Sequence, residues 1–498
     1  MFLDSFAFWI FFLLVIVLVK RFPSKRNDVL LLASFIFYLV LIKYFLIVFL
    51  AHSLFNYYLV KFVRRQKMRK SNVRLIVIVG ILSNITLLVF IKNVQMINLS
   101  SAVKEQLLGL PTNVFQQSAI WVGLSFYILR SLSFLFDIYR KRVKYIGGLT
   151  IYFMYILFFP LVIAGPVEKA HEFIARLKKS WSISWFQISA GSQLILWGLF
   201  KKAVIADNMG LVVDGIFNNN YQHSGLVLLI SLYFYSFQIY FDFSGYSDVA
   251  IGLAYTLGFS VTQNFNSPYL ALSIIDFWKR WHISLTNWLR EYIYLPLGGN
   301  RVGTTDWIRN ILIVFFFSGL WHGLKATFLL WAMLHAVAYM ITAYLTKKST
   351  FNNTEKSFFI KQNEKTKYNH AIVFNWRRIF NLLLTFNLVS LFWLPFRADS
   401  LVQTWQIFSR IVADMIIRPL AGQLKPLTLI NSGYTKRFLL VWGLIIVFAL
   451  ALDYFRRENL LVPKKVPTWL KWGLLYVLIF GLVFFSQMEP QQFIYARY

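Results

Sequence analysis

The sequence predicts an all-α, polytopic integral membrane protein, a helical bundle of about 11 to 14 spans with re-entrant helices between them. Of its 498 residues, 58% are hydrophobic and only 14% are charged. About a quarter of the residues in a soluble domain are charged. Apolar runs near the length that crosses a bilayer recur along the whole chain. We therefore expect one membrane body and not a string of soluble domains.

The composition also excludes several classes of protein. The chain has no cysteine, which excludes thiolate nucleophiles, disulfides and cysteine-ligated zinc. It contains no phosphate-binding glycine loop, zinc-peptidase motif or nucleophile elbow. The net charge of +31 comes from short basic clusters between apolar runs, which is the positive-inside pattern of a membrane protein. We expect contact with membrane lipid, and no nucleic acid, metal or bound cofactor.

The order of apolar and basic segments predicts the topology. The candidate spans are 2–19, 29–43, 45–62, 74–91, 119–138, 149–166, 184–205, 226–257, 308–324, 326–346, 376–395, 437–455 and 468–486. Basic clusters after the first, third and fifth spans place those loops in the cytoplasm and the N-terminus outside. The basic cluster Arg456 to Lys465 also predicts a cytoplasmic loop, which thirteen alternating spans would place outside. Two crossings within the overlong 226–257 would restore agreement and place the tail 487–498 outside. The polar stretch 347–370 is the most loop-like part of the chain.

His322 is the strongest candidate for chemistry, because it lies in the apolar segment Phe317 to Gly323. An ionisable group in such a segment usually faces a cavity and serves a function. Gly319 and Gly323 are four residues apart, so one helix face has little bulk and a substrate could approach. Imidazole is suited to taking a proton from a hydroxyl, although a core histidine bonded to a carbonyl fits equally well. His335 would lie about 140° away on one continuous helix, but Gly323 favours a break.

A second polar block, Asp276 to Tyr292, is amphipathic, aromatic and basic, and it is too polar to span a bilayer. It predicts a re-entrant or interfacial helix that carries His282. Its cations, Lys279, Arg280 and Arg290, could hold phosphates or the acidic face of a carrier. A helix whose basic side chains only reach for the membrane surface is the alternative.

Two acids upstream, Asp242 and Asp248, lie six residues apart in apolar surroundings. Paired carboxylates could form a cation site or perform acid–base chemistry. Structural hydrogen bonding to Tyr, Ser or Arg side chains is the interpretation that we favour. The remaining histidines are expected to be solvated or interfacial: His52, His171, His223 and His370.

These blocks together resemble the membrane-bound O-acyltransferase (MBOAT) family, more narrowly its bacterial branch of alginate and peptidoglycan O-acetylation membrane proteins. The matching stretches, in order, are F-D-F-S-G-Y-S-D, N-F-N-S-P-Y, D-F-W-K-R-W-H-I-S-L, W-L-R-E-Y-I-Y-L-P-L-G-G-N-R and S-G-L-W-H-G. The resemblance implies one membrane domain over 1–498 around a central tunnel, with its catalytic core at about 119–346.

The resemblance also implies roles for individual residues. His322 matches the family's hallmark histidine and would act as general base, while His282 would help to orient the donor or stabilise the oxyanion. Tyr495 matches the tyrosine of an aromatic C-terminal motif that is proposed to carry the acyl group outward, although Ala496 and Arg497 depart from that motif. The residues expected to bind substrate are Trp321, Trp281, Asn264, Asn266, Arg280 and Asp242.

The implied activity is the transfer of an acetyl group from a cytoplasmic donor, with acetyl-CoA expected, across the cell inner membrane. The acceptor would be an extracytoplasmic polysaccharide, either an alginate-like exopolysaccharide or peptidoglycan, and a periplasmic SGNH or serine-type O-acetyltransferase partner would finish delivery. D-alanyl transfer to teichoic acid remains open, although Leu295 to Arg301 and the spans after 376 favour acetyl transfer. Direct acylation of a lipid or protein hydroxyl, and a transporter without chemistry, also remain open.

Overall fold

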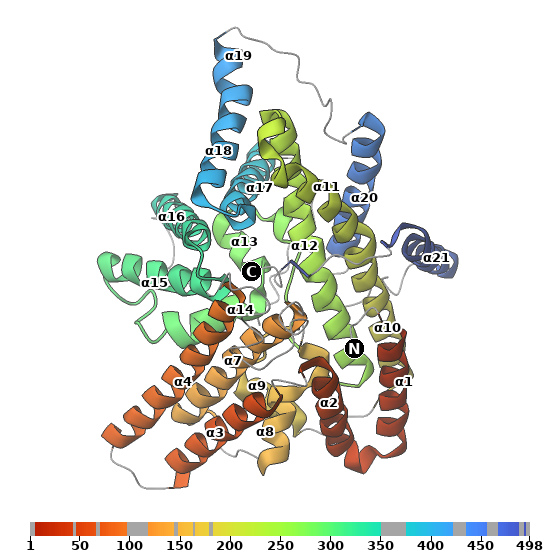
Figure 1. Cartoon of the computed structure of the whole chain (residues 1–498), viewed down its shortest axis with the longest axis vertical. Helices are drawn as coiled ribbons and strands as arrows, with labels where there is room; N and C mark the ends of the chain where they lie inside the picture. Colours follow the sequence, from red (N-terminus) through yellow and green to blue (C-terminus); the bar gives the residue numbers. More distant parts are fainter. Residues whose placement is uncertain are drawn as a thin grey trace, which may run out of the picture. The chain divides into compact units, whose positions relative to one another are not determined.

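The computed structural model describes residues 5–42, 46–65, 70–96, 118–143, 148–162, 165–178, 183–349, 375–421, 435–455, 467–487 and 493–494. In these residues the regular secondary structure is helical, without a strand (Figure 1). The chain divides into two compact units. The first comprises Met1–Asn208, Gln238–Asn264 and Phe455–Tyr498, and the second comprises Met209–Phe237 and Phe265–Tyr454.

The polytopic helical membrane fold is confirmed. Seven described helices are long and apolar enough to cross a membrane: Leu46–Val63, Asn72–Phe90, Gly225–Thr256, Ala326–Thr346, Trp376–Arg397, Arg437–Phe455 and Thr468–Phe485. A further pair, Phe6–Arg21 and Pro23–Leu41, passes the same test together but is bent by 113°. Among the described residues this number is lower than the expected 11 to 14, and the candidate spans 149–166 and 184–205 form α-helices of only 10 and 15 residues.

The proposed division of 226–257 into two crossings is wrong, because α12 (Gly225–Thr256) is one continuous helix of 32 residues. The run 149–166 instead contains only a ten-residue helix, α8 (Gly148–Leu157), and a short 3-10 turn. Ten residues rise about 15 Å, half of the roughly 30 Å of a bilayer core.

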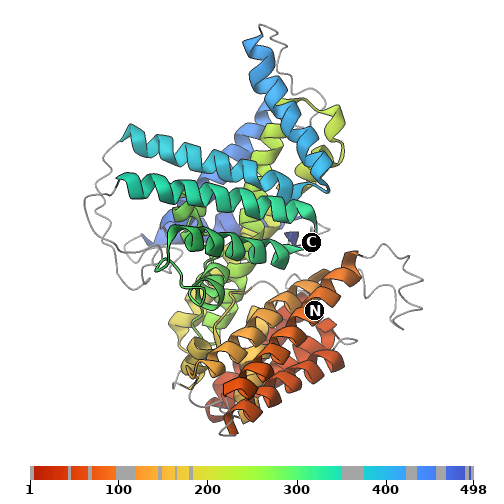
Figure 2. The same cartoon turned by 90° about the vertical axis from the view of Figure 1, so that its left-hand side faces the viewer.

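The described residues of the first unit include the following α-helices or parts of α-helices. They are α1 (Phe6–Arg21), α2 (Arg26–Ile42), α3 (Leu46–Arg65), α4 (Lys70–Met96), α7 (Ser118–Tyr139), α8, α9 (Ala170–Leu177), α10 (Trp185–Leu199), the C-terminal part of α12, and α21 (Thr468–Phe485). Ser184 begins α10 with a capping box, in which its side chain and that of Gln187 each bond the other's backbone N–H. Figure 2 shows α3, α4 and α7 side by side.

Glycines bring α10 and α12 into backbone contact. A Cβ on Gly198 would lie 2.5 Å from the carbonyl oxygen of Gly245, and one on Gly191 would lie 2.2 Å from Oγ1 of Thr256. Neither distance is possible for a side chain, so the two helices can approach this closely only because glycine occupies these positions. The π-helical turn η3 (Phe200–Ala206) follows directly and carries two buried lysines, Lys201 and Lys202.

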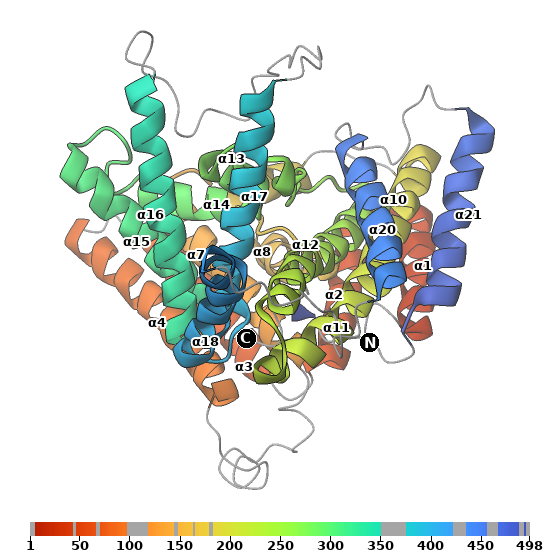
Figure 3. The same ribbon diagram turned by 90° about the horizontal axis from the view of Figure 1, so that it is seen from above.

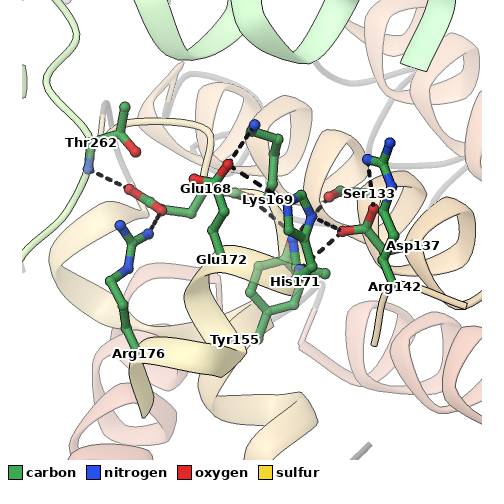
Figure 4. A network of polar contacts seen from close by, with 11 residues as sticks. Ser133, Asp137, Arg142, Tyr155, Glu168, Lys169, His171, Glu172, Arg176 and Thr262 are labelled. Carbon is green, nitrogen blue, oxygen red and sulfur yellow. Dashed lines mark hydrogen bonds and ion pairs between the residues drawn. The ribbon is translucent and has the colours of Figure 1, made fainter. Parts of the chain in front are cut away.

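A polar network fastens α9 within the first unit (Figure 4). The carboxylate of Asp137, fully buried on α7, accepts hydrogen bonds from the backbone N–H and from Nδ1 of His171, at 2.9 and 2.8 Å. Glu168 pairs with Arg176 and accepts a 2.5 Å hydrogen bond from the backbone N–H of Thr262. His171 therefore has a structural role as a hydrogen-bond partner of Asp137, while its side chain stays 27% exposed.

The second unit carries the remaining helices. They are α11 (Asp207–Asn218, from Met209 on), the N-terminal part of α12, α13 (Ile274–Arg280), α14 (Ile283–Leu289), the π-helical turn η6 (Arg290–Tyr294), α15 (Thr304–His322), α16 (Ala326–Ser349), α17 (Trp376–Arg397), α18 (Leu401–Val412), η7 (Ala413–Ile417), α19 (Arg418–Leu420) and α20 (Lys436–Phe455). Helices α15, α16 and α17 form a packed layer, and α16 and α17 run alongside each other in Figures 2 and 3.

Candidate functional site

His322 is the last residue of α15 and is 5% exposed. The helix ends because Gly323 is extended, with φ 170° and ψ 171°. A Cβ on Gly323 would lie 2.6 Å from the ring of Phe328, and one on Gly319 would lie 3.0 Å from the carbonyl oxygen of Phe328. The space that the two glycines leave is therefore filled by α16, which brings that helix against the imidazole.

Aromatic rings surround His322 on several sides. Its ring centroid lies 4.8 Å from Trp321, 5.0 Å from Trp331 and 5.1 Å from Phe396, and each ring meets the imidazole nearly edge to face. Trp331 comes from α16 and Phe396 from α17. Three helices therefore build an apolar enclosure around one ionisable group, where electrostatic interactions are stronger than in water.

His282 reaches the same enclosure from the turn between α13 and α14. Its ring lies 5.8 Å from Trp321, the tryptophan that also contacts His322. The backbone of His282 is left-handed, with φ 42°, and strained residues of this kind cluster at functional sites. His282 does not belong to any of the candidate membrane spans. Burial lowers the pKa of its imidazole to about 3, so the imidazole is neutral at physiological pH. A neutral imidazole can orient a donor or acceptor without adding charge.

His335, on α16, is fully buried among aromatic rings. Its neighbours are Phe277, Trp278, Trp331, Phe392 and Trp393, with ring centroids 5.0 to 6.2 Å away. Neither of its ring nitrogens has a hydrogen-bond partner among the described residues, and the same holds for the indole nitrogens of Trp278, Trp331 and Trp393.

Unsatisfied polar atoms are rare in protein interiors and cost about 1–3 kcal/mol each when buried. Here the three indoles lie with their ring centroids 5.1 to 6.2 Å from the imidazole of His335, and one of them, Trp331, also packs on His322. We call His322, Trp331, His335, Trp278 and Trp393 the aromatic chamber. The indole N–H groups of Trp278, Trp331 and Trp393 and the ring nitrogens of His335 have the chemistry to hydrogen-bond water or a substrate carbonyl or hydroxyl.

The expected break after His322 is confirmed, because α15 ends there and α16 begins at Ala326. The geometry of one continuous helix does not apply, and the two histidines instead lie on different helices that pack together. Trp331 stands between them, with His322 at 5.0 Å and His335 at 5.3 Å.

The other expected residues of the second unit lie around this chamber or beside it. Trp281 is buried and packs on Trp393, with ring centroids 4.9 Å apart. Arg280 forms an ion pair with Asp276 at 2.9 Å, one helical turn earlier. The backbone N–H of Asn266 donates to the carbonyl of Arg280 at 2.9 Å. The structure therefore brings His322, His282 and Trp321 together, and it gives Arg280 and Asn266 contacts that shape the turn.

Two expected residues belong to the first unit. The buried Asn264 donates to the hydroxyl of Ser247 at 3.0 Å. Asp242 pairs with Lys202 at 2.8 Å, and Asp248 pairs with Lys201 at 2.5 Å. The structural interpretation of the two acids fits these contacts, although the partners include lysines and not only the Tyr, Ser or Arg side chains that we favoured. Tyr495 lies outside the described residues, and so do residues 350–370 of the expected polar loop.

The sequence interpretation missed Trp331, Trp393 and Phe396, because aromatic residues in apolar helices are usually lipid-facing or core. One signal was present in the sequence. Trp331 and His335 are four residues apart, which places them on one face of a helix. Among the described residues, no group of three or more His, Asp or Glu side chains is placed to hold a metal ion.

The sequence also matches a known family. Residues 79–391 match the family described as MBOAT, membrane-bound O-acyltransferase family. The chain belongs to the MBOAT family. The match covers more than half of the chain and includes α15, α16, His322 and His335. The resemblance noted in the sequence is thereby confirmed, and it places the chain among the acyltransferases.

Three MBOAT relatives illustrate the branch. The probable alginate O-acetylase AlgI of Pseudomonas syringae is 34% identical over 66% of this chain and 63% of the relative. The peptidoglycan O-acetyltransferase of Helicobacter pylori is 31% identical over 77% of this chain and 73% of the relative. The teichoic acid D-alanyltransferase of Bacillus subtilis is 30% identical over 43% of this chain and 53% of the relative. The matched region thus spans less than two thirds of that alginate O-acetylase.

Proposed function

We propose that this protein is a membrane O-acyltransferase that moves an acetyl group from a cytoplasmic donor, acetyl-CoA, across the cell inner membrane. The acetyl group would serve O-acetylation of an extracytoplasmic polysaccharide of the alginate or peptidoglycan type. The observation that carries the proposal is the aromatic chamber, in which a buried imidazole at His322 adjoins N–H groups without partners.

In the proposed step, Nε2 or Nδ1 of His322 takes the proton from an acceptor hydroxyl as its oxygen attacks the thioester carbonyl. The new ester bond forms, the C–S bond breaks, and the leaving thiolate takes a proton from the imidazolium, which restores neutral His322. A developing oxyanion would accept hydrogen bonds from the unpaired indole N–H groups or from His282. The apolar walls keep water away from the thioester.

The acceptor hydroxyl inside the membrane protein is, in this proposal, that of Tyr495. A phenol with a pKa near 10 needs a base to become a nucleophile. The acetyl ester would then pass to the serine of a periplasmic SGNH-type O-acetyltransferase, which delivers it to sugar hydroxyls.

Acetyl transfer is favoured over D-alanyl transfer by the extent of the similarity. The peptidoglycan O-acetyltransferase match extends over 77% of this chain, and the D-alanyltransferase match extends over 43%. A direct comparison of acetyl-CoA with D-alanyl-carrier protein as donors tests this choice. Faster thioester loss with the D-alanyl carrier would reverse it.

The absence of cysteine makes the donor test simple, because coenzyme A would supply the only free thiol in the assay. The purified protein is placed in proteoliposomes, with acetyl-CoA on one side of the membrane and a soluble SGNH-type O-acetyltransferase, whose serine accepts the acetyl group, on the other. We expect the thiol of coenzyme A to be released from acetyl-CoA. Unchanged thioester, with acetyl-CoA and with an acetylated carrier protein, would contradict the proposal and favour a transporter.

A further inference from the structure

The last described residues of the chain, Phe493 and Ile494, are buried within the first unit, at 5% and 2% exposure. The ring of Phe493 packs on Tyr246 and Phe243 of α12, with centroids 4.8 and 5.8 Å apart. A chain end with ordinary surface contacts would not bury two consecutive residues. This segment is therefore held against α12.

A buried carboxylate holds the backbone of the segment. Oδ2 of Asp242 accepts a hydrogen bond from the N–H of Ile494 at 2.6 Å. Oδ1 of the same carboxylate lies 2.8 Å from Nζ of Lys202, and that ammonium lies 2.6 Å from Asp207. The three side chains are at most 8% exposed. A charged acceptor in a low-dielectric interior makes a strong and directional hydrogen bond.

The chain fold delivers these charges from a π-helical turn. Lys201 and Lys202 are consecutive in η3, yet both reach acids, since Lys201 lies 2.5 Å from Asp248 of α12. Such π-turns are frequent at functional sites. This cluster has one more carboxylate than ammonium groups: Asp207, Asp242 and Asp248 against Lys201 and Lys202. The N–H of Ile494 supplies a further hydrogen-bond donor to the carboxylate of Asp242.

The same part of the first unit also holds the chain at residues 481–487. A Cβ on Gly481 of α21 would lie 2.4 Å from the ring of Phe200, so α21 rests directly on η3. Asn208 then donates to the carbonyl of Phe485 at 2.8 Å and accepts from the amide of Gln487 at 2.5 Å. The chain is thus fixed at residues 481–487 and again at residues 493–494.

We propose that Asp242, set by Lys202, is a positioning residue that anchors the C-terminal segment through the Ile494 N–H, one residue before the proposed acyl carrier Tyr495. The proposal rests on the proposed function, in which the Tyr495 hydroxyl receives the acetyl group. It gives Asp242 a role in placing the acceptor, in place of the substrate contact that the sequence suggested.

Replacing Ile494 tests the anchor without disturbing the buried charges. Ile494→Pro removes the N–H that Asp242 accepts, and Ile494→Val keeps it with a similar side chain. Because the chain has no cysteine, an added Ala496→Cys can carry a single nitroxide spin label. Spectra are recorded on the full-length protein in detergent, in the otherwise unchanged background, with Ile494→Val, with Ile494→Pro and with Asp242→Ala.

We expect a motionally restricted spectrum in the unchanged background and with Ile494→Val, and a sharp, mobile spectrum with Ile494→Pro and Asp242→Ala. Equal spectra in the unchanged background, Ile494→Val and Ile494→Pro would overturn the anchor. If Asp242→Ala does not fold, the Ile494 pair still decides, because it leaves the charge cluster intact.

A transfer assay on the same variants separates the anchor from the function. Acetyl label on the C-terminal peptide should fall roughly 10- to 100-fold with Ile494→Pro, the effect of a displaced reacting group, while acetyl-CoA binding is unchanged. Full labelling of Ile494→Pro overturns the positioning role. If the unchanged protein transfers no acetyl but its spectra still differ from those of Ile494→Pro, the anchor stands and the proposed function fails.

Discussion

The imidazole of His322 packs edge to face on the indole of Trp331, with ring centroids 5.0 Å apart and ring planes at 88°. The indole of Trp331 has His335 as another neighbour, at 5.3 Å. One tryptophan thus joins the histidine that ends α15 to the histidine in the middle of α16. The Trp331 N–H has no partner among the described residues, so it remains available to hydrogen-bond a substrate.

Trp331→Phe should separate the two roles of this indole. The substitution keeps an aromatic ring beside His322 but removes the N–H, so kcat should fall by about 10²-fold if the N–H stabilises the oxyanion. Trp331→Ala should also lower the free energy of unfolding by about 3–5 kcal/mol through the cavity that it creates. Transfer assays and thermal unfolding check these effects.

The matched control is Trp376→Phe, at a tryptophan on α17 that is 74% exposed. It should change neither quantity. Normal kcat in Trp331→Phe would show that the indole N–H takes no part in the reaction.

His282 predicts a specific dependence of stability on pH. Its pKa in the folded protein, about 3, lies below the usual 6.5 because burial disfavours the charged form. The unfolded chain therefore binds a proton that the folded chain does not, and stability falls as the pH falls from 6.5 toward 3. At pH 5 this loss is about 2 kcal/mol, from 1.36 kcal/mol per pKa unit.

Thermal unfolding of detergent-solubilised protein at pH 7 and pH 5 measures this loss. The His282→Gln variant should lose less stability between the two pH values than the unchanged protein. Parallel pH dependence in the two proteins would assign the acid sensitivity to other groups.

Replacing two glycines by alanine should change the free energy of unfolding in opposite directions, because one glycine lies in the contact between α10 and α12 and the other does not. A methyl group on Gly198 would lie 2.5 Å from a backbone oxygen that cannot move independently, so Gly198→Ala should destabilise the protein by about 1–3 kcal/mol. Gly215 of α11 has no atom within 4 Å of its would-be Cβ. Gly215→Ala should instead stabilise its helix by about 0.5–1 kcal/mol.

Thermal unfolding distinguishes the two substitutions. An unchanged or raised Tm for Gly198→Ala would mean that the helices separate more readily than the contact distance implies.

Local sequence patterns predicted the parts of the site that depend on one segment. The apolar segment around His322 indicated a buried imidazole, and Gly323 indicated the end of its helix. The polar block after Asp276 indicated one re-entrant or interfacial helix, and the structure has two short helices there, α13 and α14. Each of these features follows from composition or from glycine and charge positions within about ten residues.

Features that join distant segments could not be predicted in this way. Asp242 meets Lys202, which lies forty residues earlier in the chain, and Ile494, which lies 252 residues later. Hydropathy alone could not show that 226–257 forms one helix, because a long apolar run is equally compatible with two short crossings. Likewise, Asp137 makes His171 a structural residue through a contact between α7 and α9 that neither segment reveals alone.

The most direct test of the proposed mechanism follows radiolabelled acetyl from acetyl-CoA in purified protein, with the unchanged chain beside His322→Ala, Tyr495→Phe and the control His223→Ala. We expect label on the C-terminal peptide of the unchanged chain and of His223→Ala, none on Tyr495→Phe, and a reduction of about 10²–10⁴-fold in His322→Ala, the usual loss for a general base. Undiminished labelling in a folded His322→Ala would contradict the role of His322 as the base for acyl transfer.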